Sequence, residues 1–255
     1  MRLLTWNIHK GIGGVDGRYA PGRVTAVIAH YQPDIVLLQE VDDGCPRSGG
    51  DRQVDLLADV LELPHRAYGA NVSLTRGRYG NATLSRWPIL HDHNVNLRFG
   101  PKKARGALIT DIEVEDNGHR SRLHVVNLHL GLSGVERRWQ AHRLLAAVRL
   151  THLTRASRLI IAGDFNDWSG AVPRLMMAHY GLRCVTGRGR SATRTFPAWA
   201  PMGSLDRVLV RGDLACTKHY ASRLDLARQA SDHLPVVVEL YLRHSNNSAP
   251  AATAR

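Results

Sequence analysis

A short apolar run that ends in polar residues constrains this chain most. Residues 159–166 read LIIAGDFN, in which four apolar residues predict a buried strand and Gly163 ends it. Asp164 and Asn166 come directly after that point. Because a buried strand is rigid while the loop after it leaves room for a ligand, we expect both side chains to point into a cleft. Alternatively, Asp164 starts a turn or caps the helix expected near Gly170, since Asp and Asn favour both positions.

Polar residues stand at the ends of other apolar runs in the same way. We expect strands over 2–6, 34–42, 79–85, 106–115, 120–130, 204–210 and 231–240. The polar residues at these strand ends are Asn7, Glu40, Asn81, His129, Asp206, Asp232 and His233. Glu is a poor strand former, so its place in an apolar run at position 40 favours a function over a solvated strand end. Asn-x-His follows an apolar run at both 7–9 and 127–129, so two halves of the chain are expected to present similar strand ends to one cleft.

Helical spacing of apolar residues predicts helices over 21–30, 52–63, 135–156 and 172–180. Asp116-Asn117-Gly118 is a strong hairpin signal between the strands expected on either side of it. His91 and His93 flank Asp92 with a spacing that could chelate a metal, but we interpret this stretch as a solvated edge strand. The helices and strands together indicate an α/β protein.

The chain is strongly basic. Its formal charge is +12 and its pI is near 10.3, and nearly all of the basic residues are Arg, because Lys occurs only at 10, 102, 103 and 218. Arg presents a planar fork that suits phosphate oxygens, which favours a polyanionic partner, although a compositional bias toward Arg explains the same count. Charge alone does not separate DNA, RNA and anionic lipid.

No linker rich in Pro, Gly or Ser divides the 255 residues, so we expect one domain over residues 1–243 and a disordered tail over 244–255. Cys45, Cys184 and Cys216 are widely spaced and odd in number, which indicates neither a disulfide framework nor a zinc site and fits a reducing compartment. The first residues hold too short an apolar run for a secretory signal, and no 18 apolar residues occur together. We therefore expect a soluble, cytoplasmic protein without a transmembrane segment, whose oligomeric state is left open.

The strand-end residues suit one kind of chemistry. Carboxylates and amides without clustered cysteines suit a hard cation such as Mg²⁺ or Mn²⁺, and Glu40 is the first candidate ligand. Such a cation, with histidines and amides, meets the needs of phosphodiester hydrolysis, which are to neutralise phosphate charge, hold an attacking water and stabilise developing negative charge. An acid beside a histidine fixes its tautomer and raises its pKa, and Asp206 and His233 are the candidates for that pair.

Six motifs in order resemble those of the endonuclease/exonuclease/phosphatase superfamily. They are Thr5-Trp6-Asn7-Ile8-His9, Leu38-Gln39-Glu40-Val41, Asn127-Leu128-His129, Gly163-Asp164-Phe165-Asn166, Leu205-Asp206-Arg207-Val208 and Ser231-Asp232-His233-Leu234-Pro235. The match spans residues 2 to about 242. No single motif is decisive, whereas six in the right order are. The resemblance implies a four-layer α/β sandwich of two packed mixed β-sheets flanked by helices, with the active site at the strand ends.

The resemblance also implies roles for the strand-end residues. Glu40 would bind the metal with help from Asn7, and Asp232 would lie near the same metal. Asp164 would orient or activate the attacking water, and Asn166 would contact the phosphate. The remaining candidates are His129 and His233 on either side of the scissile phosphate, Asp206 as a buttress for His233, and Asn7, Asn81 and His129 as substrate contacts. Whether Asp164 or His233 takes the proton stays open.

Two departures narrow the branch of this superfamily. The abasic-site repair branch carries a Tyr in its middle section and DNA-inserting loops, and although Tyr79 lies nearby we see no clear equivalent of those loops. The secreted deoxyribonuclease branch has a signal peptide and disulfides, and neither is indicated here. What remains resembles small bacterial members whose substrates range over nucleic acids, sphingolipids and inositol phosphates.

The leading hypothesis is a Mg²⁺-dependent endonuclease, because each phosphate contact adds affinity for a polyanion. Against it, no aromatic and basic residues interleave along the sequence as a stacking platform. The alternative is a phospholipid or inositol-phosphate hydrolase, since the family grafts different substrate loops onto one site, and an exposed apolar patch within 42–51, 98–105 or 187–201 would favour lipid. A catalytically inactive phosphate-binding module is disfavoured because the acidic and histidine set is intact.

Overall fold

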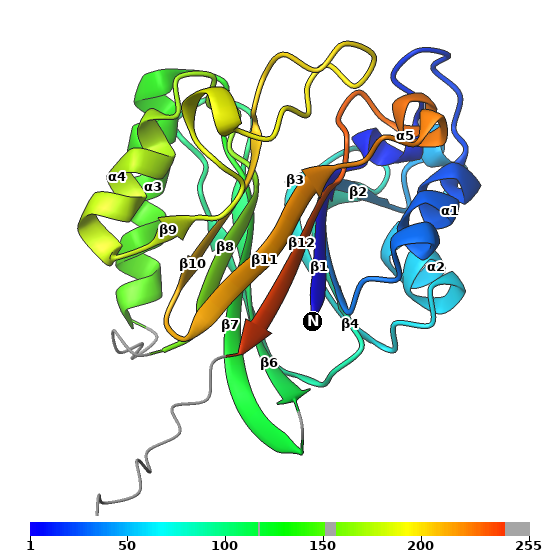
Figure 1. The fold of residues 1–255 in the computed structure, drawn as a ribbon. Coiled ribbons are helices and arrows are strands. Elements are labelled where there is room, and N and C mark those ends of the chain that lie inside the picture. The colour runs from blue at the N-terminus through cyan, green and yellow to red at the C-terminus, as the bar shows by residue number, and fades with distance from the viewer. Residues whose placement is uncertain (117, 151–156, 243–255) are drawn as a thin grey trace, which may run out of the picture.

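The computed structural model describes residues 1–116, 118–150 and 157–242, which form two six-stranded sheets packed against each other (Figure 1). The strands of the first sheet are β1 (Arg2–Asn7), β2 (Ile35–Asp43), β3 (His65–Ser73), β4 (Arg78–Ser85), β11 (Leu214–Ala221) and β12 (Val236–Leu242), in the order β11-β12-β1-β2-β4-β3. The strands of the second are β5 (Ile89–Asn96), β6 (Gly106–Asp116), β7 (His119–His129), β8 (Leu159–Asp164), β9 (Arg183–Cys184) and β10 (Asp206–Arg211), in the order β5-β6-β7-β8-β10-β9. Both sheets are mixed, because β1 and β2, and β7 and β8, pair in parallel while the other pairs are antiparallel.

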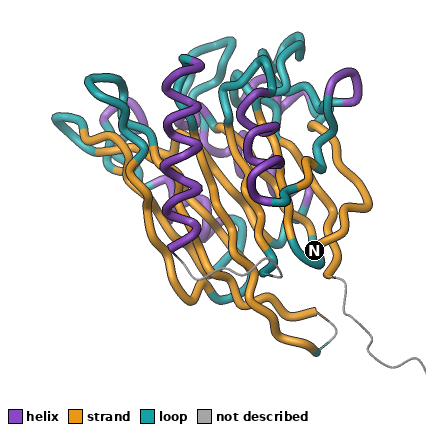
Figure 2. The backbone as a smooth tube through the Cα atoms, turned by 90° about the vertical axis from the view of Figure 1, so that its left-hand side faces the viewer, coloured by secondary structure: helices purple, strands orange, loops and turns teal. Residues whose placement is uncertain are grey.

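Helices cover the outer face of each sheet, which confirms the predicted four-layer sandwich. The helices α1 (Pro21–Tyr31), α2 (Gln53–Val60) and α5 (Asp225–Ala230) lie on the first sheet, and α3 (Gly134–Leu150) and α4 (Ala171–Tyr180) lie on the second (Figure 1). Figure 2 shows helices running along the sheets, with many of the connecting loops gathered at one end. Among the described helices, none has the length and apolar character that a membrane crossing requires.

Three apolar layers hold the sandwich together. Alternate side chains of a strand point to opposite faces, so in β1 Leu4 and Trp6 pack under α1 and α5 whereas Leu3 packs between the sheets. The same holds in β8, where Ile161 faces the helices and Ile160 faces the other sheet. Because both faces of these strands are buried, their sequences are continuously apolar instead of alternating.

Most predicted elements are present with shifted ends. The helix predicted over 52–63 ends at Val60, and the helix predicted over 135–156 is described to Leu150, so that residues 151–156 lie outside the described residues. Asn117 of the predicted hairpin and the predicted tail over 244–255 also lie outside them. Several elements escaped prediction, among them β3, β11 and α5, because they carry partly exposed, mixed sequences with weak periodicity.

Candidate active site

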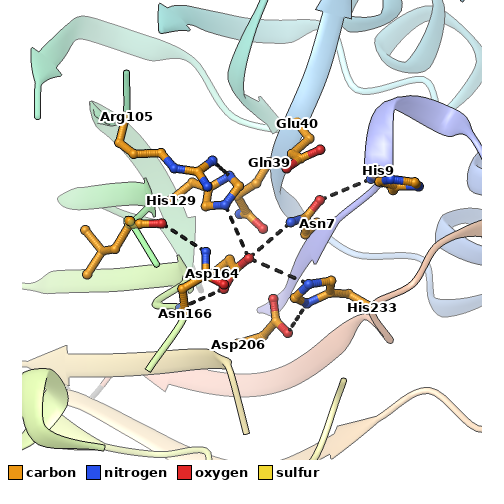
Figure 3. A network of polar contacts seen from close by, with 12 residues as sticks. Asn7, His9, Gln39, Glu40, Arg105, His129, Asp164, Asn166, Asp206 and His233 are labelled. Carbon is orange, nitrogen blue, oxygen red and sulfur yellow. Dashed lines mark hydrogen bonds and ion pairs between the residues drawn. The ribbon is translucent and has the colours of Figure 1, made fainter. Parts of the chain in front are cut away.

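The polar residues predicted at strand ends converge on Asp164, which ends β8. Its Oδ2 accepts a hydrogen bond from Asn7 Nδ2 at 3.1 Å (Figure 3). The same oxygen lies 3.4 Å from His129 Nε2 and 3.7 Å from His233 Nε2. Residues from both sheets therefore direct nitrogen atoms at one carboxylate oxygen.

The loop after β8 fixes the orientation of the Asp164 carboxylate. Asp164 is 1% exposed, and its Oδ1 accepts a hydrogen bond from the backbone N–H of Asn166 at 2.8 Å. Asn166 has a positive φ of 50°, and its side-chain amide donates to Leu130 O at 2.9 Å. The N-cap of α4 is Gly170, and Asp167 Oδ2 accepts from the N–H of Val172 in the first turn. Asp164 therefore forms a turn with Asn166 but does not cap the helix.

His233 is held by a buried carboxylate on its other side. Its Nδ1 lies 2.8 Å from Asp206 Oδ2, which also accepts the hydroxyl of Thr195 at 2.5 Å. Burial alone would lower the pKa of His233, but the carboxylates of Asp206 and Asp164 outweigh it and raise the pKa to about 10. The ring is thus held as an imidazolium between two carboxylates. Burial, with the charge of Asp206, also raises the pKa of Asp164 to about 6.

His129 has the opposite electrostatic environment. Its Nδ1 lies 3.2 Å from a guanidinium nitrogen of Arg105. Arg can only donate, so Nδ1 must be the acceptor and the proton of the ring must be on Nε2, facing Asp164. Burial and the charge of Arg105 hold the pKa of His129 well below its usual range. His129 is therefore a neutral ring whose Nε2–H faces Asp164.

Glu40 does not lie at a strand end, as was predicted, but inside β2. The strand continues to Asp43, and its register with β4 shifts between Leu38 and Val41, which is a β-bulge. Glu40 has a φ of 57° in this bulge, a conformation that costs energy for a non-glycine residue and is most often found at functional sites. Its carboxylate forms an ion pair with Lys10. Burial alone would raise the pKa of Glu40, but the ammonium of Lys10, which carries a positive charge and donates to the carboxylate, acts against burial and lowers the pKa.

The donor set around Glu40 suits a hard divalent cation. Its carboxylate is ionised and already attracts the ammonium of Lys10, and the amide oxygen of Asn7 retains a lone pair beside its contact with His9 N. A second group, Asp164, Asp206 and His233, offers ligand atoms within 4.8 Å of one another. That group is less suited to a metal, because Asp206 and His233 are already hydrogen-bonded to each other.

The structure places two other predicted residues apart from this network. Asp232 is half-buried beside His233, where its charge contributes to the raised pKa of that ring, and its Oδ1 accepts the hydroxyl of Ser231. Asn81 is 1% exposed, and its amide donates to the backbone oxygens of Gly106 and Asn127 between the sheets. The roles of Asp232 as a metal ligand and Asn81 as a substrate contact stay predictions.

The repeated Asn-x-His pattern does not place equivalent side chains. Asn7 and His129 reach Asp164, whereas His9 contacts Ile12 O in a loop. Asn127 links the sheets instead, with its amide donating to backbone oxygens of the first sheet. The two strand ends thus meet at Asp164 but contribute different residues of the pattern.

Sequence reasoning missed the residues that position the network. These are Lys10, Gln39, Arg105, Thr195 and Ser231, which contact Glu40, Asn127, His129, Asp206 and the backbone of Asn7, respectively. Gln39 and Ser231 stand inside two of the quoted motifs, which is a signal that could have found them. The sequence around Arg105 does not distinguish it from the nearby Lys102 and Lys103, because the role of Arg105 arises from its contact with His129 in β7.

Comparisons with known proteins point to the same family that the sequence motifs resemble. A model of the Endonuclease/Exonuclease/phosphatase family matches residues 4–233. The uncharacterized protein YbhP of Escherichia coli is 32% identical over 253 residues, which cover 94% of this chain and 96% of YbhP. The crystal structure of an endonuclease/exonuclease/phosphatase from Beutenbergia cavernae is 27% identical, with a TM-score of 0.77 over 94% of this chain and 71% of that chain. A mannosyl-6-phosphatase from Bacteroides thetaiotaomicron, 17% identical, shares the fold with a TM-score of 0.71 over 95% of this chain and 100% of its own. With nearly its whole length matched by the family model, this chain belongs to the endonuclease/exonuclease/phosphatase family.

Proposed function

We propose that this protein is a divalent-metal-dependent phosphodiester hydrolase that acts on nucleic acid as an endonuclease. The observation that carries the proposal is the convergence of Asn7, His129 and His233 nitrogens on one oxygen of buried Asp164. Nitrogen donors gathered in a water-poor site are arranged to stabilise the negative charge that develops on a phosphate under attack.

Each side chain has a role that follows from its contacts. Asp164 is the base that orients the attacking water and takes its proton, because His233 lies between two carboxylates and is held as a cation. His233 and the neutral Nε2–H of His129 donate to phosphate oxygens. Asp206 orients the His233 ring and maintains its charge. Asn166, partly exposed at the rim, is a further phosphate contact.

Glu40, Asn7 and Asp232 are the residues that we assign to a divalent cation, Mg²⁺ or Mn²⁺. A cation bound there would neutralise phosphate charge and polarise the scissile bond. Lys10 contacts the same Glu40 carboxylate, so we expect its ammonium to leave that carboxylate when a metal ion binds.

Strong positive charge supports nucleic acid as the substrate class, because the chain carries a formal charge of +12. A specific observation favours phospholipid as a second candidate. Trp168, Trp199 and Met202 are 60%, 68% and 65% exposed, and they lie on the loops after β8 and before β10. Exposed Trp and Met residues near a phosphate site also suit the interface of a bilayer.

Cleavage of a fluorescent oligonucleotide over a Mg²⁺ titration tests the proposal. We expect Mg²⁺ to stimulate the wild type and Glu40→Gln to lose about 10²-fold or more of that activity, while its melting temperature shows that it folds. The exposed Glu62 provides the matched control Glu62→Gln, which should behave as the wild type. An unchanged Mg²⁺ response in folded Glu40→Gln would overturn the metal assignment. Preferential hydrolysis of anionic phospholipid vesicles would move the substrate assignment to lipid.

A further inference from the structure

A cavity of about 610 Å³ lies beside the candidate active site and is strongly cationic. Its walls include Arg174, Arg188, Arg194 and Arg207, together with Trp168. None of the described residues that line it is acidic. The loop between β9 and β10, yellow at the top of Figure 1, supplies several of these residues. Four guanidinium groups around one cavity, without a carboxylate among them, make a site for an anion.

Arg207 is the clearest sign that this cavity is built for a ligand. It is 7% exposed, yet its Nε is buried without a partner and its guanidinium makes no hydrogen bond or ion pair with any described residue. Arg105, equally buried, does have a partner in His129. A largely buried guanidinium whose Nε has no partner costs free energy, so Arg207, which lines the cavity, is a residue whose partner is expected from outside the protein.

A second guanidinium lies close to the same point. A Cβ placed on Gly170 would be 3.4 Å from Arg174 Nη1 and 3.6 Å from Arg207 Nη2. The two cations therefore converge on the start of α4, where repulsion between them is relieved when an anion binds.

The cavity is connected to the catalytic residues across the sheet edge. Asp206 and Arg207 are consecutive in β10, so their side chains point to opposite faces, Asp206 toward His233 and Arg207 into the cavity. The ring of Phe196 links the two sites. Its centroid lies 4.8 Å from the centroid of the His233 ring and 6.1 Å from that of the Trp168 ring. Trp168 leans against Gly203, where a Cβ would come within 2.9 Å of its ring, and it remains 60% exposed.

We propose that this cavity binds a second phosphate of the substrate strand, one or two nucleotides from the scissile bond, while a neighbouring base stacks on Trp168. The identity of the strand rests on the proposed function, and the inference adds to it a subsite that selects substrates with a flanking phosphate. One exposed aromatic ring, that of Trp168, stands here among four arginines that are scattered along the sequence, which gives a place for one stacked base beside a phosphate. An exposed aromatic face next to cations suits nucleic acid, in which each base lies beside a phosphate.

Binding of inorganic pyrophosphate, followed by thermal shift in EDTA, tests the subsite without any catalysis. We expect pyrophosphate to raise the melting temperature of the wild type, and Arg207→Gln to require at least about tenfold more of it. Without pyrophosphate, Arg207→Gln should melt no lower than the wild type, because it removes an unpartnered buried charge. Arg190→Gln is the control, since Arg190 is exposed on the same loop but does not line the cavity. Equal pyrophosphate sensitivity in the wild type and Arg207→Gln would overturn the subsite.

Oligonucleotides with a single neutral methylphosphonate at successive positions then test the strand assignment. We expect one position, one or two nucleotides from the cleaved bond, at which the neutral linkage raises KM about tenfold in the wild type with little change in kcat. Arg207→Gln should show the raised KM on the unmodified strand and no further response at that position. A response at that position as large in Arg207→Gln as in the wild type would overturn the inference.

The two arms separate failure of the subsite from failure of the proposed function. A wild type that cleaves no oligonucleotide overturns the endonuclease proposal and the strand assignment, whereas the pyrophosphate arm alone decides whether the cavity binds phosphate. Arg207-dependent binding to anionic phospholipid vesicles, without binding to oligonucleotides, would likewise overturn the strand assignment.

Discussion

Replacement of Asp206 tests how far His233 depends on a buried carboxylate. Asp206 is completely buried, and its Oδ2 accepts from both His233 Nδ1 and the Thr195 hydroxyl. Asp206→Ala leaves both donors without an acceptor, and breaking a buried charge pair in this way costs about 3–5 kcal/mol of unfolding free energy. Asp206→Asn keeps an acceptor oxygen but removes the charge, so it should be less destabilising.

The charge of Asp206 also controls the protonation of His233. The pKa of His233 is raised from an ordinary 6.5 to about 10 in the folded protein, against the effect of burial and through Asp206 and Asp164. A raised histidine pKa contributes stability that is complete below pH 6.5 and is lost as pH rises through about 10. Asp206→Asn should therefore flatten the fall of stability between pH 6.5 and 10. If His233 acts as an imidazolium, the variant should also lose about 10²–10⁴-fold in kcat at neutral pH.

Urea unfolding across this pH range and steady-state kinetics on a phosphodiester measure the two effects. Asp167→Ala is the control, because Asp167 is 1% exposed and accepts from the first turn of α4 without touching the histidines. It should also cost stability, because Asp167 accepts from Ser169 and lies 3.6 Å from Arg137 Nη2, but it should leave kcat within a few-fold, on the order of two to three. The reasoning is refuted if folded Asp206→Asn retains kcat within tenfold of the wild type and the same dependence of stability on pH.

Three further predictions concern other parts of the structure. Arg105→Met should let the proton of the His129 ring move between the two ring nitrogens and should raise the pKa of His129 toward its usual range, with about a tenfold loss in kcat. NMR titration of the His129 ring measures this pKa, and an unchanged pKa in the variant would contradict the account. Asp111 accepts from His124 and its pKa is lowered although burial opposes this, so its stabilisation is lost as pH falls through that lowered pKa; acid unfolding of Asp111→Asn should be shallower than that of the wild type. Gly163 has a φ of 132°, and a Cβ there would lie 2.0 Å from Leu128 O. Gly163→Ala should therefore lower the free energy of unfolding, measured in urea, by at least about 3 kcal/mol. A decrease under about 1 kcal/mol would contradict the close approach of β7 and β8 at this point.

The strand ends were predictable because they are local features. Apolar runs that stop at Gly163 or at the hairpin near 118 determine where strands end, and parallel pairing brings the ends of neighbouring strands to one edge. His129 and Asp164 therefore come together at the ends of β7 and β8, as the sequence indicated. His233 instead reaches Asp164 from the residues before β12, a strand that is antiparallel to β1 and begins only at Val236. Glu40 was placed wrongly relative to its strand, because a β-bulge depends on pairing with β4 and leaves no clear pattern in β2 itself.

Partners that act across the sheets could not be predicted. Arg105 follows two lysines in a polar segment, and only its contact with β7 distinguishes it from them. Arg207 stands in a quoted motif, but that it is buried without a partner is visible only once the loop before β10 encloses it. The positive charge of the sequence predicted a polyanionic partner. The proposed binding site for that partner could be found only from the three-dimensional arrangement of the arginines.

The most direct test of the central claim is nicking of supercoiled plasmid by the purified protein with Mg²⁺, compared with EDTA and with His233→Ala. The account predicts nicking by the wild type with Mg²⁺, none in EDTA, and a loss of at least about 10²-fold in folded His233→Ala. Nicking that persists in EDTA or in His233→Ala would contradict the assigned chemistry. Absence of nicking by the folded wild type with Mg²⁺ would contradict the endonuclease assignment.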